Sequence, residues 1–190
     1  MLTLSTSETL QDTLMRRLML LRHAKSDWPF GVDDRERPLA KRGRRACPLM
    51  GRYMADEALV PDLAVVSTAR RARETWKLTR PAFGTDIVRL DEPRIYEASA
   101  GVILEVIRET QPGVRTLLLV GHNPGMHDLA LKLVGEASQS DLARLRLKYP
   151  TAGLVVIDFK IAHWSDASEG LGRLERFETP TSVANLDPIG

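Results

Sequence analysis

Short apolar runs recur along the chain, separated by longer stretches in which apolar and polar residues mix. Each run is only four or five residues long, which suits a strand buried on both faces, although periodicity alone also allows a buried helical turn. Charged or turn-forming residues bound the runs, as expected for strands. The runs lie at 18–21, 63–66, 87–90, 116–120 and 154–157.

The stretches between the runs show the apolar spacing of helices. Helices are predicted over 40–59, 70–77 and 100–109, and another is predicted to start near Pro124, which suits a first helical turn. Pro48 lies inside the first helix and predicts a kink or a separate first turn. Strands that alternate with helices indicate an α/β protein, here a three-layer α/β/α sandwich with a mostly parallel, doubly wound sheet.

Three further segments complete this outline. Residues 161–164 and 172–177 are expected to add an antiparallel ribbon. Residues 33–39 are charged and broken by a proline, which places them on the surface as a connection.

The two ends of the chain differ in composition from its centre. Residues 1–16 are polar and rich in Ser and Thr, and they are expected to form a flexible extension. Residues 17–179 are predicted to form one domain. Residues 180–190 are predicted to form a tail without regular secondary structure.

Composition supports a single globular domain and narrows the classes of partner. Of the 190 residues, 43% are hydrophobic, and 27 basic against 25 acidic residues give a net charge of +2. Any positive field must therefore come from local clusters, of which 41–45 and 70–73 are the strongest. Such clusters are usually solvated helix faces, and without interleaved aromatic residues they do not favour a nucleic-acid partner.

Cysteine content and hydropathy bear on location. Cys47 is the only cysteine, so no disulfide can form within the chain, and a reducing cytoplasm fits. The start of the chain lacks the pattern of a signal peptide, and 18 consecutive apolar residues occur nowhere. The sequence therefore predicts a cytoplasmic protein without a membrane partner.

Cationic and imidazole side chains follow three of the predicted strands. Arg22 and His23 come after the first strand, Arg71 lies shortly beyond the second, and His122 follows the run at 116–120. The carboxyl ends of strands in a doubly wound sheet meet at one edge, where such folds form their ligand crevice. We expect these side chains to lie together and to bind an anionic group.

The same residues carry a resemblance to a known family. Residues 22–28 resemble the Arg-His-Gly opening of the histidine phosphatase superfamily, although position 24 is Ala; the Ala-Lys-Ser form resembles the small SixA-type phosphohistidine phosphatases. Residues 67–75 resemble the second-arginine motif and residues 120–124 the second-histidine motif, so the resemblance spans about 18–159. It implies a phosphoglycerate-mutase-like fold. Because the family motif normally lies almost at the amino terminus, residues 1–16 can also precede the native start.

The resemblance implies roles for four residues. His23 would attack phosphorus and form a covalent phosphohistidine that water then hydrolyses. Arg22 and Arg71 would clamp the phosphoryl oxygens with paired N–H groups, and His122 would hydrogen-bond the transferring group from the other side. The ordinary histidine pKa of about 6.5 already makes the nucleophilic neutral form common at pH 7, and neighbouring guanidinium groups favour it further.

Further candidates surround these four. Asn123 is expected to bond substrate or, more in keeping with its position, to shape the turn, while Lys25 and Ser26 are candidates for the mouth of the pocket. Ser67, Thr68 and Thr75 are expected to bond the backbone near the arginine loop rather than to act as nucleophiles.

The proton donor is the least defined part of the predicted site. Glu97 and, less directly, Glu92 are candidates for a general acid, and the alternative is that both are solvated loop carboxylates. Neither a metal-ligand pattern nor a cofactor motif is present, so no metal and no cofactor are expected.

The sequence thus predicts a metal-independent phosphohistidine phosphatase acting through His23. The alternatives are a phosphatase for small phosphomonoesters and a catalytically weak phosphate-binding or interaction module. A phosphorylated protein or a small phosphate compound is the expected partner, and the oligomeric state and physiological substrate stay open.

Overall fold

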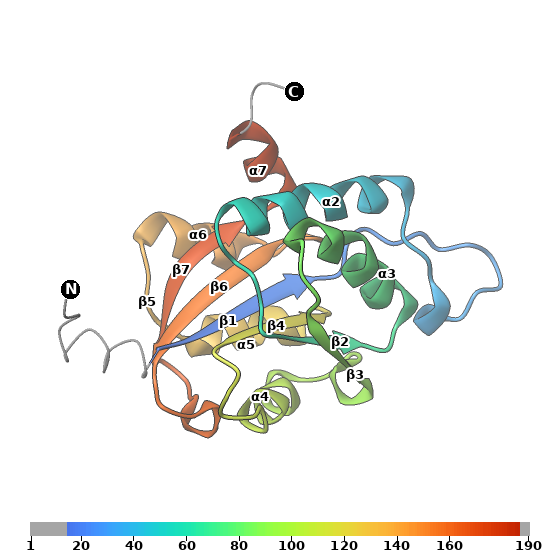
Figure 1. The fold of residues 1–190 in the computed structure, drawn as a ribbon. Coiled ribbons are helices and arrows are strands. Elements are labelled where there is room, and N and C mark those ends of the chain that lie inside the picture. Colours follow the sequence, from blue (N-terminus) through green and yellow to red (C-terminus); the bar gives the residue numbers. More distant parts are fainter. Residues whose placement is uncertain (1–14, 187–190) are drawn as a thin grey trace.

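The structure, a computed structural model, describes residues 15–186. Its strands form one seven-stranded sheet in the order β3-β2-β4-β1-β6-β7-β5 (Figure 1). The strands are β1 Met15–Arg22, β2 Leu63–Ser67, β3 Val88–Glu92, β4 Thr116–Gly121, β5 Val134–Glu136, β6 Leu154–Lys160 and β7 Gly172–Glu178. The helices are α2 Lys41–Asp56, α3 Arg70–Thr79, α4 Ala100–Arg108, α5 Gly125–Leu133, α6 Gln139–Leu147 and α7 Pro180–Leu186. Short 3-10 helices are η1 Asp34–Glu36, η2 Arg80–Phe83, η3 Pro93–Ile95 and η4 Trp164–Asp166.

Helices cover both faces of the sheet, which confirms the predicted three-layer α/β fold (Figure 1). Strand β4 pairs in parallel with β1 and β2, and β3 and β5 each pair in parallel with a neighbour. Only β6 runs antiparallel to its neighbours, β1 and β7. The sheet is therefore mostly parallel, as predicted.

Two hydrophobic cores lie on the two faces of the sheet. Alternate residues of a strand point to opposite faces, so β1 sends Leu18 and Leu20 into one core and Met19 and Leu21 into the other. All four are fully buried, and each such side chain contributes about 1.5–3 kcal/mol relative to an exposed one. This two-sided burial is the physical reason for the uninterrupted apolar runs in the sequence.

Several element boundaries differ from those predicted. Strand β1 starts at Met15, two residues before the expected domain boundary, because Met15 and Arg16 already pair with β6. The rest of the expected amino-terminal extension lies outside the described residues. Helix α2 continues through Pro48, so the alternative of a separate first turn is wrong.

The carboxyl-terminal third holds the larger corrections. The predicted ribbon between 161–164 and 172–177 does not form, because β7 pairs with β6 instead. Residues 180–186, expected to lack regular structure, form helix α7, whose Val183 is buried against the second core. Residues 187–190 of the expected tail lie outside the described residues. Strand β5 and helix α6 were not predicted at all.

The sheet order places the ends of two strands side by side where the site forms. Arg22 at the end of β1 is in register with Gly121 at the end of β4, and the His23 amide donates to the Gly121 carbonyl at 3.0 Å. The residues that follow these strands must therefore be neighbours. Across residues 15–186, no helix is both long and apolar enough to cross a membrane.

Candidate active site

His23 and His122 meet at the carboxyl edge of the sheet. Each follows one of the paired strands β1 and β4, and their ring centroids lie 5.0 Å apart. Their residues are only 8% and 3% exposed, so the two imidazoles form the inner part of the site. The structure thus brings together the two histidines that the sequence placed at separate strand ends.

The main chain fixes the tautomer of His23. Its Nδ1 lies 2.8 Å from the carbonyl oxygen of Ala24, and because a carbonyl can only accept, Nδ1 must carry the proton. Nε2 is then left with its lone pair. The Ala24 amide in turn donates to Thr75 Oγ1 at 3.0 Å, so position 24 acts through its backbone and its methyl group is buried in the core.

Burial keeps both imidazoles neutral. Desolvation lowers the pKa of His23 to about 3, and the charges of Arg71, Arg22 and Arg37 add to this effect against the opposing hydrogen bond to Ala24. Burial also lowers the pKa of His122 to about 3, helped by its proximity to His23 and Arg71. At neutral pH, His23 is therefore an uncharged imidazole with a free nitrogen lone pair.

Ser67 at the end of β2 holds the second histidine. Its Oγ lies 2.7 Å from His122 Nε2 and accepts from the Ala69 amide at 3.4 Å. His122 Nδ1 is buried and has no partner among the described residues. Thr75 Oγ1 donates to the Arg71 carbonyl at 2.6 Å, in keeping with the backbone-bonding role expected of it, while Thr68 Oγ1 is buried without a partner in the described chain.

Two arginines bring positive charge to these histidines, Arg22 from the end of β1 and Arg71 from the first turn of α3. Arg22 donates from Nη1 to the Tyr149 carbonyl at 2.7 Å. Arg71, only 4% exposed, donates from Nη1 to the Asp34 carbonyl at 2.6 Å and from Nη2 to Asp34 Oδ2 at 2.9 Å. The Nε of each guanidinium is buried without a partner in the described part of the chain. Both arginines thus keep N–H groups for an additional acceptor.

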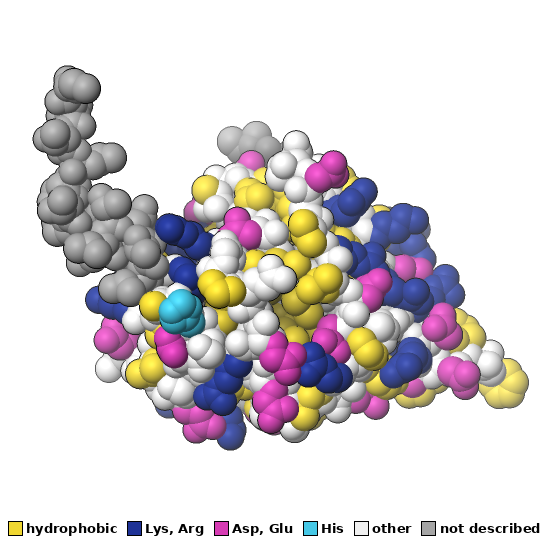
Figure 2. All heavy atoms as spheres, turned by 60° about the horizontal axis from the view of Figure 1, so that its bottom comes forward, with side chains coloured by type: hydrophobic (Ala, Val, Ile, Leu, Met, Phe, Trp, Pro, Cys, Tyr) yellow, Lys and Arg dark blue, Asp and Glu magenta, His cyan; other side chains and the backbone are white. Residues whose placement is uncertain are grey.

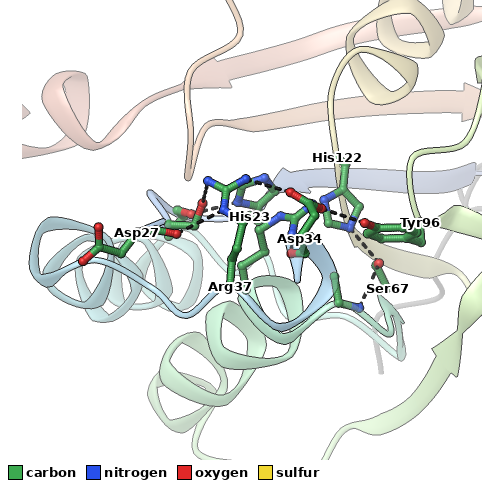
Figure 3. A network of polar contacts seen from close by, with 11 residues as sticks. His23, Asp27, Asp34, Arg37, Ser67, Tyr96 and His122 are labelled. Carbon is green, nitrogen blue, oxygen red and sulfur yellow. Dashed lines mark hydrogen bonds and ion pairs between the residues drawn. The ribbon is translucent and has the colours of Figure 1, made fainter. Parts of the chain in front are cut away.

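Asp34, Arg37 and Tyr96 complete the network, and sequence reasoning missed all three (Figure 3). Asp34 accepts from Tyr96 OH at 2.6 Å and from Arg37 Nη1 at 2.9 Å, in addition to Arg71. The Tyr96 ring stands edge-on to His122 with centroids 5.5 Å apart. Partial burial raises the pKa of Asp34, but the hydrogen bonds from Tyr96, Arg37 and Arg71 outweigh burial and hold it well below its usual range.

The segment that carries Asp34 was expected to be a surface connection, and that interpretation is wrong for part of it. Arg37 and Asp34 have side chains only 16% and 31% exposed, because η1 folds over the end of α3. No periodic pattern could have signalled this, since the segment belongs to neither a strand nor a long helix. The only local signal was its alternation of acidic and basic residues next to Pro38.

The lesser sequence candidates have varied positions. Asn123 Nδ2 donates to the Tyr149 carbonyl at 3.0 Å, the same oxygen that Arg22 binds, which fits the turn-shaping interpretation. Ser26 Oγ accepts from Arg37 Nη2 at 2.8 Å, so it positions an arginine of the site. Lys25 is exposed to solvent.

The two candidate acids both lie outside this network. Glu92 accepts from the backbone amide of Arg94 and pairs with its guanidinium, so it caps η3. Glu97 is exposed and has a left-handed backbone with φ of 50°.

Charge defines what this site can bind. The positive charges of Arg22, Arg37 and Arg71 lie near enough to neutral His23 to lower its pKa, while Asp34 supplies one negative charge. The excess of positive charge suits an anion with several oxygen acceptors, such as a phosphoryl group. Within the described chain, His, Cys, Asp and Glu side chains do not form a group of three or more that could hold a metal ion.

The chain is similar in sequence to known proteins. A family profile described as the histidine phosphatase superfamily (branch 1) matches residues 18–111. The chain is 38% identical over 164 residues to the uncharacterized protein Rv1276c of Mycobacterium tuberculosis H37Rv, covering 84% of this chain and 99% of that protein.

Solved structures extend the similarity to three dimensions. A protein from Agrobacterium tumefaciens, described as a candidate phosphohistidine phosphatase SixA, is 32% identical with a TM-score of 0.74, covering 87% of this chain and 98% of that one. A protein from Nakamurella multipartitia with the same description is 25% identical with a TM-score of 0.77, covering 87% and 96%. The predicted phosphoglycerate-mutase-like α/β fold is therefore confirmed.

Proposed function

This chain belongs to the histidine phosphatase superfamily, and from that membership we propose that it hydrolyses phosphohistidine in proteins through a covalent phosphohistidine on His23. The observation that carries the proposal is the fixed tautomer of His23. Its Nδ1 proton is engaged by the Ala24 carbonyl, and its Nε2 lone pair is left beside three guanidinium groups. A neutral imidazole nitrogen in a cationic, mostly buried site is suited to attack an anionic phosphorus centre.

The proposed reaction has two steps. His23 Nε2 forms a bond to phosphorus while the bond from phosphorus to the substrate imidazole nitrogen breaks, and the substrate ring, protonated from solvent on its other nitrogen, leaves as neutral imidazole. A water molecule then attacks the phosphoryl group on His23, releasing inorganic phosphate and a proton and restoring neutral His23. No metal and no cofactor take part in this proposal.

The remaining site residues would stabilise the transferring group. Arg22 and Arg71 keep their Nε–H groups for phosphoryl oxygens, and two N–H bonds from a planar guanidinium match the geometry of phosphate. If the Ser67 hydroxyl donates to His122 Nε2, the His122 proton lies on Nδ1, the buried atom without a partner in the described chain. That Nδ1–H would then bond a phosphoryl oxygen opposite His23.

The acid–base character of the site favours phosphohistidine over alkyl phosphates. Glu92 is tied to Arg94, Glu97 is exposed, and Asp34 has a depressed pKa that keeps it ionised and unable to donate a proton at neutral pH. An alkoxide leaves poorly without a proton, whereas phosphohistidine that is protonated on its other ring nitrogen releases a neutral imidazole, whose conjugate acid has a pKa of about 6.5, with little help. We therefore propose a substrate whose leaving group needs no strong general acid.

The proposal includes a phosphorylated protein as partner and a cytoplasmic location, with which a single free cysteine, Cys47, is compatible.

Cys47 is buried, and burial raises the pKa of its thiol to about 11. It is therefore neither a thiolate nucleophile nor a disulfide partner within the chain.

A substrate panel tests the function. The purified protein is assayed with EDTA against a phosphohistidine peptide, phosphoserine, a sugar phosphate and an aryl phosphate. A general acid commonly contributes about 10²–10⁴-fold, so phosphohistidine should exceed phosphoserine in kcat/KM by at least about 10²-fold. Glu97→Gln should change phosphohistidine turnover by no more than about threefold, well below the effect of losing a general acid.

Two other results would redirect the assignment. Efficient hydrolysis of the sugar phosphate that collapses in Glu97→Gln would identify a phosphomonoesterase with Glu97 as its acid. Phosphate binding without turnover of any substrate would identify a binding module.

A further inference from the structure

Helix α3 carries a stripe of basic side chains on its outer face, which we call the α3 stripe. It consists of Arg70, Arg73 and Lys77 in α3 and Arg80 at the start of η2. Their spacing of three, four and three residues places them on one side of a helix. All four residues are exposed, whereas Arg71 of the same helix is turned inward to the site.

The stripe lines an open groove with a volume of about 590 Å³. Arg89 of β3 adds a fifth cation to the groove, and Glu36 and Glu74 are its only acidic residues in the described chain. Five positive and two negative charges line the groove, and Arg89 is in addition paired with Asp91, which is not a lining residue. The chain as a whole has a net charge of only +2, so the groove is a local concentration of charge. Lys and Arg side chains gather on the right of Figure 2, the side on which α3 lies in Figure 1.

Part of this charge is available to a partner. Arg70 pairs with Glu74, and Arg73 lies 3.9 Å from Glu36. By contrast, Lys77 and Arg80 have no ion-pair partner among residues 15–186. The two cations farther along the stripe are therefore solvated and unneutralised.

The groove adjoins the candidate active site. Glu36 lies in η1, the same short helix that places Asp34 on Arg71, and Arg73 is two residues beyond Arg71. A molecule seated in the groove would therefore reach η1 and the start of α3, the two elements that carry Asp34 and Arg71.

Exposed aromatic side chains mark the loop that precedes η1. Trp28 is 67% exposed and Phe30 is fully exposed, while the Arg37 guanidinium stacks on the Trp28 ring at 3.9 Å from its centroid. Tryptophan, other aromatic residues and arginine are enriched at the centres of protein interfaces. Large apolar side chains in water next to an active site favour a macromolecular substrate over a small one.

We propose that the α3 stripe is a docking surface for an acidic region of the phosphoprotein substrate, next to its phosphohistidine. The proposal rests on the function proposed above and names the kind of protein that the site takes. Trp76, the aromatic residue that lines the groove among those described, is buried, so the groove presents no ring on which nucleic-acid bases could stack, whereas carboxylates of a protein require only positive charge. Complementary charge of this kind acts chiefly on the rate of association and weakens with salt.

The test uses two phosphohistidine peptides of equal length, one flanked by Glu and the other by Gln. The wild type should prefer the Glu peptide by about tenfold in kcat/KM at low salt, with the preference shrinking at high salt. The double variant Lys77→Glu, Arg80→Glu should lose that preference. It should keep wild-type turnover of free phosphohistidine, which is too small to reach the groove.

A matched control changes charge equally on the other face of the sheet. Lys132 in α5 and Arg146 in α6 are exposed, and Lys132→Glu, Arg146→Glu should keep the full preference. Binding of the unphosphorylated peptides, measured by fluorescence anisotropy, detects docking without turnover. Absent turnover of free phosphohistidine would therefore contradict the proposed function and not the docking.

Two results would overturn the docking proposal. One is an undiminished preference for the Glu peptide in Lys77→Glu, Arg80→Glu, by turnover and by anisotropy. The other is a single-stranded oligonucleotide that binds the wild type more tightly than the Glu peptide and loses that binding in the same variant, which would assign the stripe to nucleic acid.

Discussion

At the scale of single residues, the backbone around position 24 prepares His23. The Ala24 carbonyl accepts a hydrogen bond from His23 Nδ1, and the Ala24 amide donates one to Thr75 Oγ1. The Thr75 hydroxyl in turn donates to the Arg71 carbonyl. The first histidine and the second arginine are therefore connected through one threonine. Because position 24 contributes main-chain atoms, the departure from the Gly of the superfamily signature leaves these contacts intact.

Arg71 should tolerate even a charge-conserving change poorly. The planar guanidinium of Arg71 makes two hydrogen bonds to Asp34 and, among the described residues, has its Nε–H free for a ligand. Arg71→Lys removes this group, so kcat/KM for phosphohistidine should fall at least about 10²-fold. The neighbouring Arg70 has a side chain 44% exposed, and Arg70→Lys keeps its charge. That control should stay within about twofold of wild type, because a solvated charge is preserved. Reversed severities in steady-state assays would show that Arg70, not Arg71, serves the site.

The buried histidines should make stability depend on pH. Their pKa values of about 3 lie below the ordinary 6.5, so below pH 6.5 the unfolded chain takes up protons that the folded protein does not. Stability should be full above pH 6.5 and fall toward pH 3, by up to about 1.4 kcal/mol per pH unit for each histidine.

Urea unfolding at pH 7.5 and pH 5.0 measures this effect. Between pH 6.5 and 5.0, 1.5 units at about 1.4 kcal/mol each give about 2 kcal/mol per histidine. The wild type should therefore lose about 2 kcal/mol more than His122→Asn over this interval. Equal losses in the two proteins would mean that His122 is not buried in its neutral form.

At the scale of elements, a close contact between α2 and the loop after β1 holds the site in place. A Cβ atom on Gly43 would overlap the Lys25 carbonyl oxygen, and that oxygen accepts from the Ala40 amide at 2.9 Å. Only glycine allows the helix backbone to come so close. Helix α2 therefore supports the loop that begins with His23.

A pair of glycine substitutions tests this support. Gly43→Ala should lower the free energy of unfolding by about 1–3 kcal/mol and reduce turnover, because α2 must move away from Lys25. Gly101 in α4 is the control, since its nearest atom to an added Cβ is Ser99 Oγ at 3.9 Å. Gly101→Ala should stabilise the protein by about 0.5–1 kcal/mol and leave activity unchanged. If thermal melts and parallel assays showed that Gly43→Ala behaves like Gly101→Ala, helix α2 would not support the loop after β1.

The elements that could be predicted are those with a repeated physical pattern. Strands β2 and β4 are buried on both faces, and their apolar runs predicted them within a residue or two. Strand β5 has three residues, none of them buried, and α6 buries only Leu145, so neither leaves a periodic signal. Asp34, Arg37 and Tyr96 were missed for a related reason, because a loop residue reaches a site through tertiary contacts that spacing does not encode.

At the scale of the whole molecule, sheet order converts distant sequence positions into one site. Strands β1, β4 and β2 lie side by side, so His23, His122 and Ser67 meet although about a hundred residues separate the first two. The overall charge near neutrality conceals a cationic centre and the α3 stripe beside it. Positive charge is thus concentrated at the site and along α3, although the net charge of the chain is small.

In the proposed reaction, His23 carries the phosphoryl group during turnover. The most direct measurement is rapid quenching of the reaction with a radiolabelled phosphohistidine substrate, followed by localisation of the label by mass spectrometry. We expect an acid-labile, base-stable label on His23 of the wild type, and a folded His23→Ala protein with neither label nor turnover. Label on another residue, or near-native turnover by His23→Ala, would contradict the mechanism.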